Sequence, residues 1–382
     1  MLIEIRKAGF TNKGAELMLY AILEKINNRY PNAQLTMAPT HAQSSQPFEK
    51  LVAKRFYPKA WLWLFNIQLG DFARYLPSKL REMYGIKLDK EVSVVIDAAG
   101  FAYSEDFGIK PTRELYRAVK RWKKNETKII LMPQAFGPFK SKITSKYVKK
   151  IIEFSDAIFP RDEFSYQSLT QIEASTKIVK YPDFTCLIDG YLPDYFDYST
   201  NRVAIIPNGR MMDKTTAEIS ALYLPFLIEC IRYLKAKDLN PFILIHEEND
   251  IFLAGKIKET VGEIPIIFDS DPLVIKGIIG QCDAIITSRF HGLVSALCQG
   301  VPAITTGWSH KYAELLNDYE YPEGIVSVTD NPTQIRKKID NLFDGKVREG
   351  LIKRLTKNAG IQKSLANDMW EVVFSIIDKS SK

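Results

Sequence analysis

The chain has 382 residues, more than a single hydrophobic core normally spans, so two domains are expected. Hydrophobic residues at 46% and charged residues at 25% are typical of a globular protein. The net charge is +7, and we interpret its two modest basic clusters, at residues 120–124 and 146–150, as solvated helix faces. Basic residues are not interleaved with stacking aromatics, which argues against a nucleic-acid-binding protein.

No apolar run is long enough to cross a bilayer, and the first residues have the pattern of a strand rather than of a signal peptide. These features predict a cytoplasmic protein, and peripheral contact at the inner membrane face stays open. The four cysteines show neither metal-type pairing nor the density of a disulfide framework, so we expect them to be reduced and buried. No histidine, cysteine and carboxylate set has metal-ligand spacing, so no metal is predicted.

Strand and helix patterns alternate through the first half of the chain. The expected strands lie at residues 2–5, 34–38, 92–97, 128–132 and 157–160, and the expected helices at 15–28, 49–56, 112–124 and 143–154. An aromatic and arginine-rich stretch at 58–85 interrupts them and is expected to form an insertion of one or two helices, most simply a packed hairpin, with a lid or an acceptor-binding surface as alternatives. This alternation favours a parallel sheet covered on both faces.

The second half repeats the alternation after a break at residues 187–201 that contains glycine and proline. Its expected strands lie at 202–206, 242–246, 266–268, 284–287, 303–306 and 324–328, and its expected helices at 217–235, 252–261, 272–279, 293–298, 332–343 and 347–377. The predicted fold is therefore α/β, with two Rossmann-like doubly wound domains, 1–190 and 200–382, that face a cleft. This resembles the GT-B layout, in which the C-terminal helix can cross back to the first domain.

The most informative stretch is residues 282–311, where His291 follows Arg289 at the end of an apolar strand pattern. The helix pattern that begins there points free N–H groups and a partial positive charge at any bound anion. Ligands of open parallel sheets bind at the carboxyl ends of the strands, where Ser288 and Gly292 also fall. The stretch therefore predicts a site for a small, multiply charged anion beside an acid. The structural alternatives are an ion pair for Arg289 and a strand-capping role for His291.

Several short motifs follow one another along most of the chain. They are Gly9-Phe10-Thr11-Asn12-Lys13-Gly14-Ala15-Glu16, Asp97–Gly100, Gln134-Ala135-Phe136-Gly137-Pro138, Arg161-Asp162-Glu163-Phe164-Ser165, Pro182-Asp183, and Ser288-Arg289-Phe290-His291-Gly292 with Ala296, Gly300, Pro302 and Lys311. In this ordered set the chain resembles the polysaccharide pyruvyl transferase family. Ala98 and Ala99 stand where that family commonly has glycines.

The resemblance implies an enzyme that moves pyruvate from phosphoenolpyruvate onto two hydroxyls of a sugar as a cyclic ketal, in bacterial exopolysaccharide or cell-surface polysaccharide biosynthesis. It implies phosphoenolpyruvate as donor, a sugar or lipid-linked oligosaccharide as acceptor, and no cofactor. The donor's anionic groups need cations, its methylene carbon needs an acid, and the sugar hydroxyl must lose a proton. Arg289 is expected to bind the donor anion, and His291 to act as general acid or phosphate contact.

The remaining candidates lie at strand ends or helix starts. Glu16 is a candidate base beside Asn12, although helix capping explains both residues more simply. Arg161 is a candidate donor contact whose alternative is an ion pair with Asp162 or Asp183. The other candidate substrate contacts are Ser288, Gly292, Lys311, Asn208, Arg210, Asp97 and Gln134.

Two alternatives to a pyruvyl transferase stay open. A GT-B glycosyltransferase would use a nucleotide sugar and would place a carboxylate near the ribose, for which Glu314 is in the right region. A non-catalytic protein of polysaccharide assembly would fit the Ala98 and Ala99 departure and the aromatic residues near Trp61. Nucleotide binding favours the first alternative, and acceptor binding without turnover favours the second.

Overall fold

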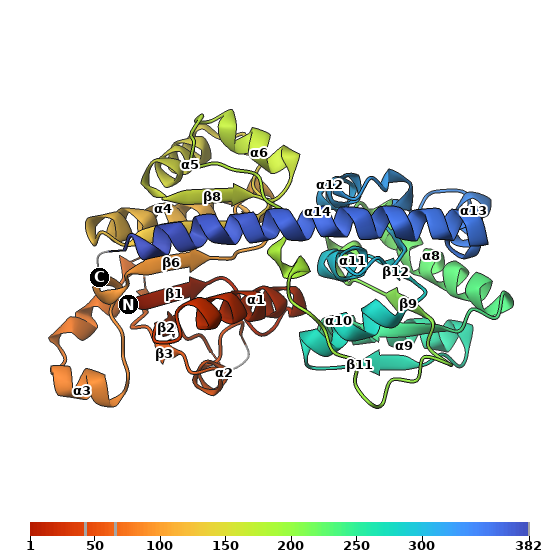
Figure 1. Ribbon diagram of the computed structural model, residues 1–382, viewed down its shortest axis with the longest axis horizontal. Coiled ribbons are helices and arrows are strands. Elements are labelled where there is room, and N and C mark those ends of the chain that lie inside the picture. Colours follow the sequence, from red (N-terminus) through yellow and green to blue (C-terminus); the bar gives the residue numbers. More distant parts are fainter. Residues whose placement is uncertain (42–43, 65–66, 381–382) are drawn as a thin grey trace. The chain divides into compact units, whose positions relative to one another are not determined.

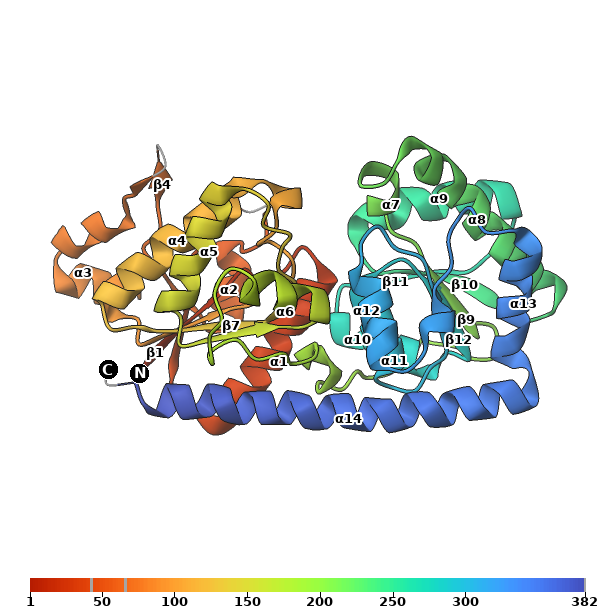
Figure 2. The same ribbon diagram turned by 90° about the horizontal axis from the view of Figure 1, so that it is seen from above.

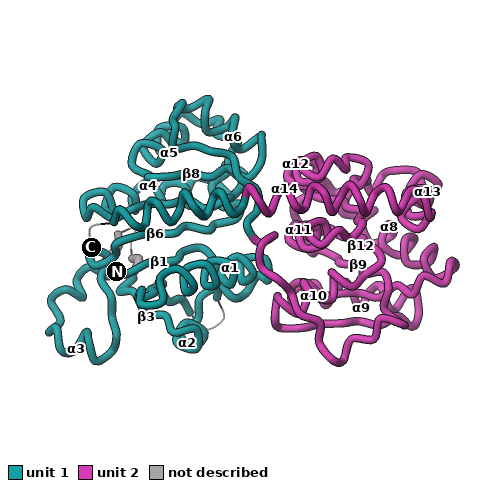
Figure 3. Tube along the Cα trace, viewed as in Figure 1, with its two compact units in different colours: residues 1–184, 366–382 teal, residues 185–365 magenta. Residues whose placement is uncertain are grey.

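The computed structural model describes residues 1–41, 44–64 and 67–380 of the chain. It divides into two compact units, coloured separately in Figure 3: unit 1 is Met1–Phe184 with Ala366–Lys382, and unit 2 is Thr185–Leu365. Each unit holds one parallel β-sheet with helices on both faces (Figures 1 and 2). No helix in the described part of the chain is long and apolar enough to cross a membrane.

The sheet of unit 1 has the strand order β3-β2-β1-β6-β7-β8, and every neighbouring pair is parallel. Its strands are β1 (Leu2–Arg6), β2 (Gln34–Met37), β3 (Tyr57–Pro58), β6 (Val94–Asp97), β7 (Lys128–Gln134) and β8 (Ala157–Pro160). The central strands are buried along their whole length, because helices cover both faces of the sheet. This explains why their sequences are nearly continuous apolar runs.

The helices of unit 1 are α1 (Lys13–Arg29), α2 (Phe48–Ala53), α3 (Ser78–Met83), α4 (Ile109–Lys124), α5 (Lys142–Phe154) and α6 (Glu163–Thr170). Figure 2 shows α4 and α5 on one face of the sheet and α1 on the other. Asn12, Ser141 and Asp162 cap α1, α5 and α6 by accepting a hydrogen bond from a backbone N–H of the first turn. These caps fix where each helix begins relative to the strand before it.

The sheet of unit 2 has the strand order β11-β10-β9-β12-β13, again all parallel. Its strands are β9 (Val203–Ile206), β10 (Pro241–Ile245), β11 (Ile266–Phe268), β12 (Ala284–Thr287) and β13 (Ala303–Thr305). Its helices are α7 (Arg210–Asp213), α8 (Ala217–Ala236), α9 (Ile251–Val261), α10 (Pro272–Gln281), α11 (Phe290–Leu297), α12 (Lys311–Asp318) and α13 (Pro332–Phe343). Helices α8 and α9 cover one face of the sheet, and α10 and α11 cover the other (Figure 2).

The last helix, α14 (Gly345–Asp378), belongs to unit 2 up to Leu365 and to unit 1 from Ala366. In unit 1, the ring of Trp370 packs edge-on against Phe184 at 6.2 Å, and Phe374 packs against Tyr30 at 5.9 Å. The expected domains were 1–190 and 200–382. The structure instead divides the chain after Phe184 and assigns the end of α14 to unit 1, because Trp370 is buried there against Phe184.

One expected strand is absent from the structure, and the expected helical insertion is present with an added hairpin. Residues 324–328 are not a strand, since only Ile325 makes a β-bridge, to Thr305, and the Asp330 carboxylate then bonds the N–H of Ser327 and turns the chain. The expected insertion at 58–85 contains one α-helix, α3, together with a hairpin of β4 (Trp63–Leu64) and β5 (Ile67–Gln68) and the 3-10 helix η1 (Gly70–Tyr75). Residues 65 and 66 of that stretch lie outside the described residues.

The chain that enters unit 2 passes directly over α10. A Cβ added to Gly277 would lie 2.1 Å from the backbone oxygen of Tyr191, and Gly190 has equally little room against α10. We expect Gly277→Ala to lower the free energy of unfolding by about 1–3 kcal/mol, because the backbone must move.

Chemical denaturation of wild type and variant measures this cost. Gly255→Ala is the control, since Gly255 lies inside α9 with no atom within 4 Å of the added Cβ, and it should gain about 0.5–1 kcal/mol. Equal unfolding midpoints for wild type and Gly277→Ala would contradict the close packing.

Candidate functional site

The carboxyl ends of four neighbouring strands form one edge of the unit 2 sheet. The segments that follow β9, β10, β12 and β13 begin at residues 207, 246, 288 and 306. The sheet is parallel, so all four segments meet at this edge, where open α/β sheets bind ligands. The edge holds seven of the expected site residues, which are Asn208, Arg210, Ser288, Arg289, His291, Gly292 and Lys311, and the N-termini of α11 and α12.

The peptide of Ser288 is held firmly at this edge. Its carbonyl accepts hydrogen bonds from Asn208 Nδ2 at 2.6 Å and from the hydroxyl of Tyr312 at 2.7 Å, and its Oγ accepts one from Tyr223 at 2.9 Å. Asn208 and Ser288 are both buried. Their observed role is therefore to fix the turn from β12 into α11.

Arg289 lies at the N-cap position of α11, with its guanidinium on two carboxylates. Nε and Nη2 donate to the two oxygens of Asp250 at 2.8 and 2.6 Å, and Nη1 pairs with Glu247. Burial raises the pKa of Asp250, and the charge of Arg289 opposes that rise. All three guanidinium nitrogens of Arg289 therefore contact carboxylates of its own chain, which is the ion pair named as the alternative to donor binding.

His291 and Lys311 come together around the ring of Phe290. His291, the second residue of α11, packs edge-on to that ring at 5.5 Å between centroids. The Nζ of Lys311, the first residue of α12, lies 5.3 Å from the Phe290 centroid and 4.6 Å from that of Trp308. Both side chains remain partly exposed. An imidazole and an ammonium thus share the edge with two helix N-termini, which suits an anion.

Ser309 is a candidate that the sequence did not single out. It lies two residues before α12, and its Oγ is buried without a hydrogen-bond partner among the residues that the structure describes. A hydroxyl at a helix start that bonds no protein atom can donate to a phosphate or carboxylate oxygen. A serine beside a tryptophan and a histidine has no distinctive spacing, so the sequence held no signal for it.

Gly292 and Arg210 play other parts than expected. A Cβ on Gly292 would lie 3.2 Å from Thr287 Oγ1, so the glycine lets the first turn of α11 pack on the strand end. The Arg210 side chain is exposed and pairs with Asp213 at 2.7 Å along its own helix.

The expected acceptor residues of unit 1 are engaged within the fold. Asn12 Oδ1 accepts from the N–H of Ala15, as a helix cap does. The buried Glu16 carboxylate bonds Lys13 Nζ at 2.8 Å and the Tyr20 hydroxyl at 3.1 Å. These contacts favour a capping role for Asn12 and a structural role for Glu16 at the helix start over a role for Glu16 as general base.

Three further candidates lie at the carboxyl ends of β6, β7 and β8 in unit 1. Asp97 is fully buried, 3.2 Å from Arg6 Nε, and burial raises the pKa of its carboxyl. Gln134 donates a long hydrogen bond, 3.4 Å, to the Asp97 carbonyl. Arg161 Nη1 pairs with Asp183 at 3.3 Å, the ion pair named as its alternative. All three side chains are buried at the carboxyl edge of this sheet.

A cavity of about 370 Å³ opens at the carboxyl ends of β1 and β2 in unit 1. Its lining includes Arg6, Lys7, Trp61 and Glu114. Glu114 accepts two hydrogen bonds from Arg6 Nη2, at 2.7 and 3.0 Å, and pairs with Lys7 at 3.1 Å. None of these residues was expected at a site. The available signal was a pair of charged residues, Glu4 and Arg6, in a strand that is otherwise apolar.

The ion pairs of Glu114 make stability depend on pH in acid. Burial alone would raise the pKa of Glu114, but Arg6 and Lys7 lower it from 4.5 to about 2. The ionised Glu114 carboxylate therefore adds about 3 kcal/mol to the free energy of unfolding above pH 4.5, and this stabilisation is lost as the pH falls toward 2. The excess unfolding free energy of wild type over Glu114→Gln should shrink from about pH 5 to about pH 3.

Urea denaturation across this pH range measures the difference. Glu49→Gln, at an exposed carboxylate in the first turn of α2, is the control and should give a nearly constant difference from wild type. A pH-independent difference for Glu114→Gln would show that the ion pairs do not lower its pKa.

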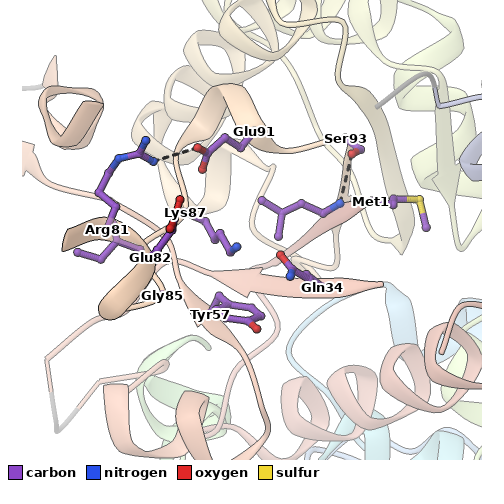
Figure 4. Close-up of a pocket in the computed structure, with 11 residues that line it drawn as sticks. Met1, Gln34, Tyr57, Arg81, Glu82, Gly85, Lys87, Glu91 and Ser93 are labelled. Atoms are coloured by element: carbon purple, nitrogen blue, oxygen red, sulfur yellow. Dashed lines mark hydrogen bonds and ion pairs between the residues drawn. The ribbon is translucent and has the colours of Figure 1, made fainter. Parts of the chain in front are cut away.

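A second cavity of unit 1, about 470 Å³, lies at the opposite edge of the sheet (Figure 4). Met1, Gln34 and Ser93 line it where β1, β2 and β6 begin. The only cation–carboxylate pair drawn there joins Arg81 to Glu91 at 3.0 Å. Ligand sites of open parallel sheets lie at the carboxyl edge, so we assign no ligand to this cavity at the amino edge.

No three histidine, cysteine or carboxylate side chains gather as a metal site in the described ranges. The four cysteines are free and buried, and burial raises the pKa of Cys230 and Cys282 above the ordinary thiol value. The raised pKa keeps the thiols of Cys230 and Cys282 protonated and unreactive.

Comparisons with known proteins agree with this architecture. A protein of Listeria monocytogenes assigned as a UDP-N-acetylglucosamine 2-epimerase has a TM-score of 0.63 at 11% identity, covering 100% of this chain and 97% of that one. The UDP-GlcNAc 2-epimerase of Neisseria meningitidis bound to UDP-GlcNAc has a TM-score of 0.59 at 11% identity, covering 98% and 99%. MurG of Acinetobacter baumannii has a TM-score of 0.52 at 10% identity, covering 98% and 99%.

These structures are GT-B proteins, and the chain has that fold: two parallel-sheet α/β domains. A comparison with curated proteins gave no match. The family model described as polysaccharide pyruvyl transferase matches residues 12–310, which include the starts of both α1 and α11. The chain therefore belongs to the polysaccharide pyruvyl transferase family.

Proposed function

We propose that this protein transfers pyruvate from phosphoenolpyruvate onto two hydroxyls of one sugar, as a cyclic ketal, in bacterial cell-surface or exopolysaccharide biosynthesis. The observation that carries the proposal is the family match, which includes the Ser288–Gly292 motif at the carboxyl edge of unit 2. The proposed donor is a substrate, and the reaction as written needs no cofactor or metal. The proposed acceptor is a sugar or a lipid-linked oligosaccharide.

The donor is assigned to the edge of unit 2 around Phe290. Phosphoenolpyruvate carries a carboxylate and a phosphate, and both are stabilised by Lys311, the hydroxyl of Ser309 and the N-termini of α11 and α12. Arg289 acts through its ion pairs with Asp250 and Glu247, which set the orientation of the first turn of α11. It is therefore a positioning residue in this account.

His291 is assigned as the general acid. It gives a proton to the methylene carbon of the donor, so the adjacent carbon becomes electrophilic and the first sugar hydroxyl adds there and loses its proton. The bond from that carbon to the phosphate oxygen then breaks. The second hydroxyl adds to the same carbon and loses its proton, so the products are the ketal and inorganic phosphate.

Turnover tests the proposal. Purified protein is incubated with phosphoenolpyruvate and a panel of glycosides and lipid-linked sugars, and phosphate release is followed together with the mass of the sugar product. The proposal expects acceptor-dependent phosphate release and a product heavier by the pyruvate ketal. Release of a nucleoside diphosphate from a nucleotide sugar, with no phosphate from phosphoenolpyruvate, would instead identify a glycosyltransferase.

We also propose that unit 1 contacts the surface of an anionic membrane at the cytoplasmic face. Between residues 48 and 84, the described residues include ten exposed large apolar side chains: Phe48, Val52, Tyr57, Leu62, Phe72, Tyr75, Leu76, Leu80, Met83 and Tyr84. The exposed cations Lys50, Lys54, Arg55, Arg74 and Lys79 lie among them, and Figures 1 and 2 show α3 standing out from the rest of unit 1. Apolar insertion and attraction to anionic lipids act together in such surfaces.

Sedimentation with phosphatidylglycerol vesicles tests this contact. Wild type should bind, and the double variant Phe72→Ser, Met83→Ser should bind at least tenfold more weakly. Val347→Ser, at a side chain 47% exposed in unit 2, is the control and should bind as wild type does. Equal binding by all three proteins would reject the surface.

A further inference from the structure

We propose that the 370 Å³ cavity of unit 1 beside Arg6 is a binding subsite for one neutral sugar residue of the acceptor. The inference rests on the proposed function, which requires a sugar acceptor and assigns it no site. The cavity lies at the carboxyl ends of β1 and β2, the edge at which parallel α/β sheets take ligands. Its volume is near the lower end of the range for small-molecule sites, which suits a single ring.

The charges around the cavity balance. The cations that line it or pair with a lining residue are Arg6, Lys7 and Lys59, and the anions are Glu4, Asp97 and Glu114. Three positive and three negative groups pair with one another at 3.2 Å or less. Such a network has no excess charge with which to hold phosphoenolpyruvate. It offers strong hydrogen bonds to an uncharged ligand instead.

Among the described residues, one donor of the lining residue Arg6 has no hydrogen-bond acceptor. The Arg6 side chain is 9% exposed, and Glu114 and Asp97 hold it through Nη2 and Nε. Its Nη1 is buried and has no hydrogen-bond partner within the described part of the chain. The guanidinium lies over the Trp122 ring, 4.9 Å from its centroid, and a small movement of the side chain would bring this donor to a ligand hydroxyl oxygen, which adds no charge.

The remaining wall suits a ring that carries several hydroxyls. Glu114 stays ionised because its ion pairs lower its pKa, so it can accept hydrogen bonds from ligand hydroxyls. Thr40 lines the same cavity, and its hydroxyl already accepts from the N–H of Gln46, so its own proton is left to donate. Trp61 contributes its half-buried indole as an apolar wall. The Nζ of Lys59 lies 5.2 Å from the centroid of that ring.

Binding of simple sugars tests the subsite. Methyl glycosides of glucose, galactose and mannose are titrated into the full chain, with ligand-observed NMR as the readout. At least one glycoside should bind wild type, and Trp61→Ala should weaken that binding at least tenfold. Phe107→Ala, which removes an exposed aromatic of unit 1 outside the cavity, should leave the affinity unchanged. Trp61→Phe keeps an aromatic wall and should lower affinity by a smaller factor.

Two results overturn the inference. One is the absence of binding by every glycoside, and the other is glycoside binding that Trp61→Ala and Trp61→Phe leave unchanged. Phosphoenolpyruvate titration of the same variants separates this test from that of the proposed function. If donor binding and phosphate release persist while the Trp61 variants leave sugar affinity unchanged, the subsite is wrong and the pyruvyl transfer stands.

Discussion

Replacing His291 with alanine is expected to lower pyruvyl transfer by about 10²–10⁴-fold, the usual loss when a general acid is removed. His291 lies in the first turn of α11, partly exposed and beside the ring of Phe290. Lys311 and the helix N-termini remain in the variant, so phosphoenolpyruvate should still bind. A large fall in kcat with a nearly unchanged donor affinity is therefore the expected result.

Steady-state phosphate release measures kcat, and calorimetry measures donor affinity. His41→Ala removes an exposed histidine of unit 1 and should retain full activity. If His291→Ala weakens donor binding but leaves kcat unchanged, His291 contacts the phosphate and is not the acid. If it changes neither quantity, His291 has no part in the reaction.

Replacing Lys59 with methionine is expected to lower the free energy of unfolding by about 3–5 kcal/mol at neutral pH. The Lys59 side chain is fully buried, and its Nζ lies 2.5 Å from both Glu4 Oε2 and Asp89 Oδ1. Without the Lys59 ammonium, the carboxylates of Glu4 and Asp89 remain buried with less positive charge beside them. The effect is larger than that of a surface ion pair because water cannot replace the missing cation.

The loss should depend on pH. Burial raises the pKa of Glu4, whereas the pKa of Asp89 is lowered, since Lys59 and Arg121 outweigh its burial. Removing Lys59 raises both values in the folded state, so protonation relieves the strain and the loss of stability should shrink as the pH falls toward about 4.

Urea denaturation at two pH values checks this prediction. Lys90→Met, at an exposed neighbour of Asp89, is the control and should change stability by less than about 0.5 kcal/mol. Adding Glu4→Gln and Asp89→Asn to Lys59→Met should restore part of the loss, because the buried charges are then gone. Lys59→Met as stable as Lys90→Met would contradict the account.

The fold could be predicted from the sequence because parallel strands buried on both faces leave continuous apolar runs. Residues 284–287 were expected as a strand, and β12 spans Ala284–Thr287. The pattern failed at residues 324–328, where strand pairing is limited to one bridge between Ile325 and the distant Thr305. Local periodicity carries no information about such contacts.

The site could be predicted less well than the fold. The motif at Ser288–Gly292 located the carboxyl edge correctly, since a strand end followed by a helix start is a local feature. The partner of Arg289 could not be predicted, because Asp250 lies 39 residues earlier in the chain. Likewise, Glu114 is 108 residues from Arg6. An arginine that binds a substrate and one that binds a carboxylate of its own chain look alike in sequence.

Calorimetric titration of phosphoenolpyruvate into the full chain tests the central claim most directly, with a uridine-diphosphate sugar as the comparison ligand. The account predicts saturable phosphoenolpyruvate binding between about 1 μM and 1 mM, weakened by Lys311→Met, and no nucleotide-sugar binding in that range. Clear nucleotide-sugar binding without phosphoenolpyruvate binding would contradict it and would make the protein a glycosyltransferase in function.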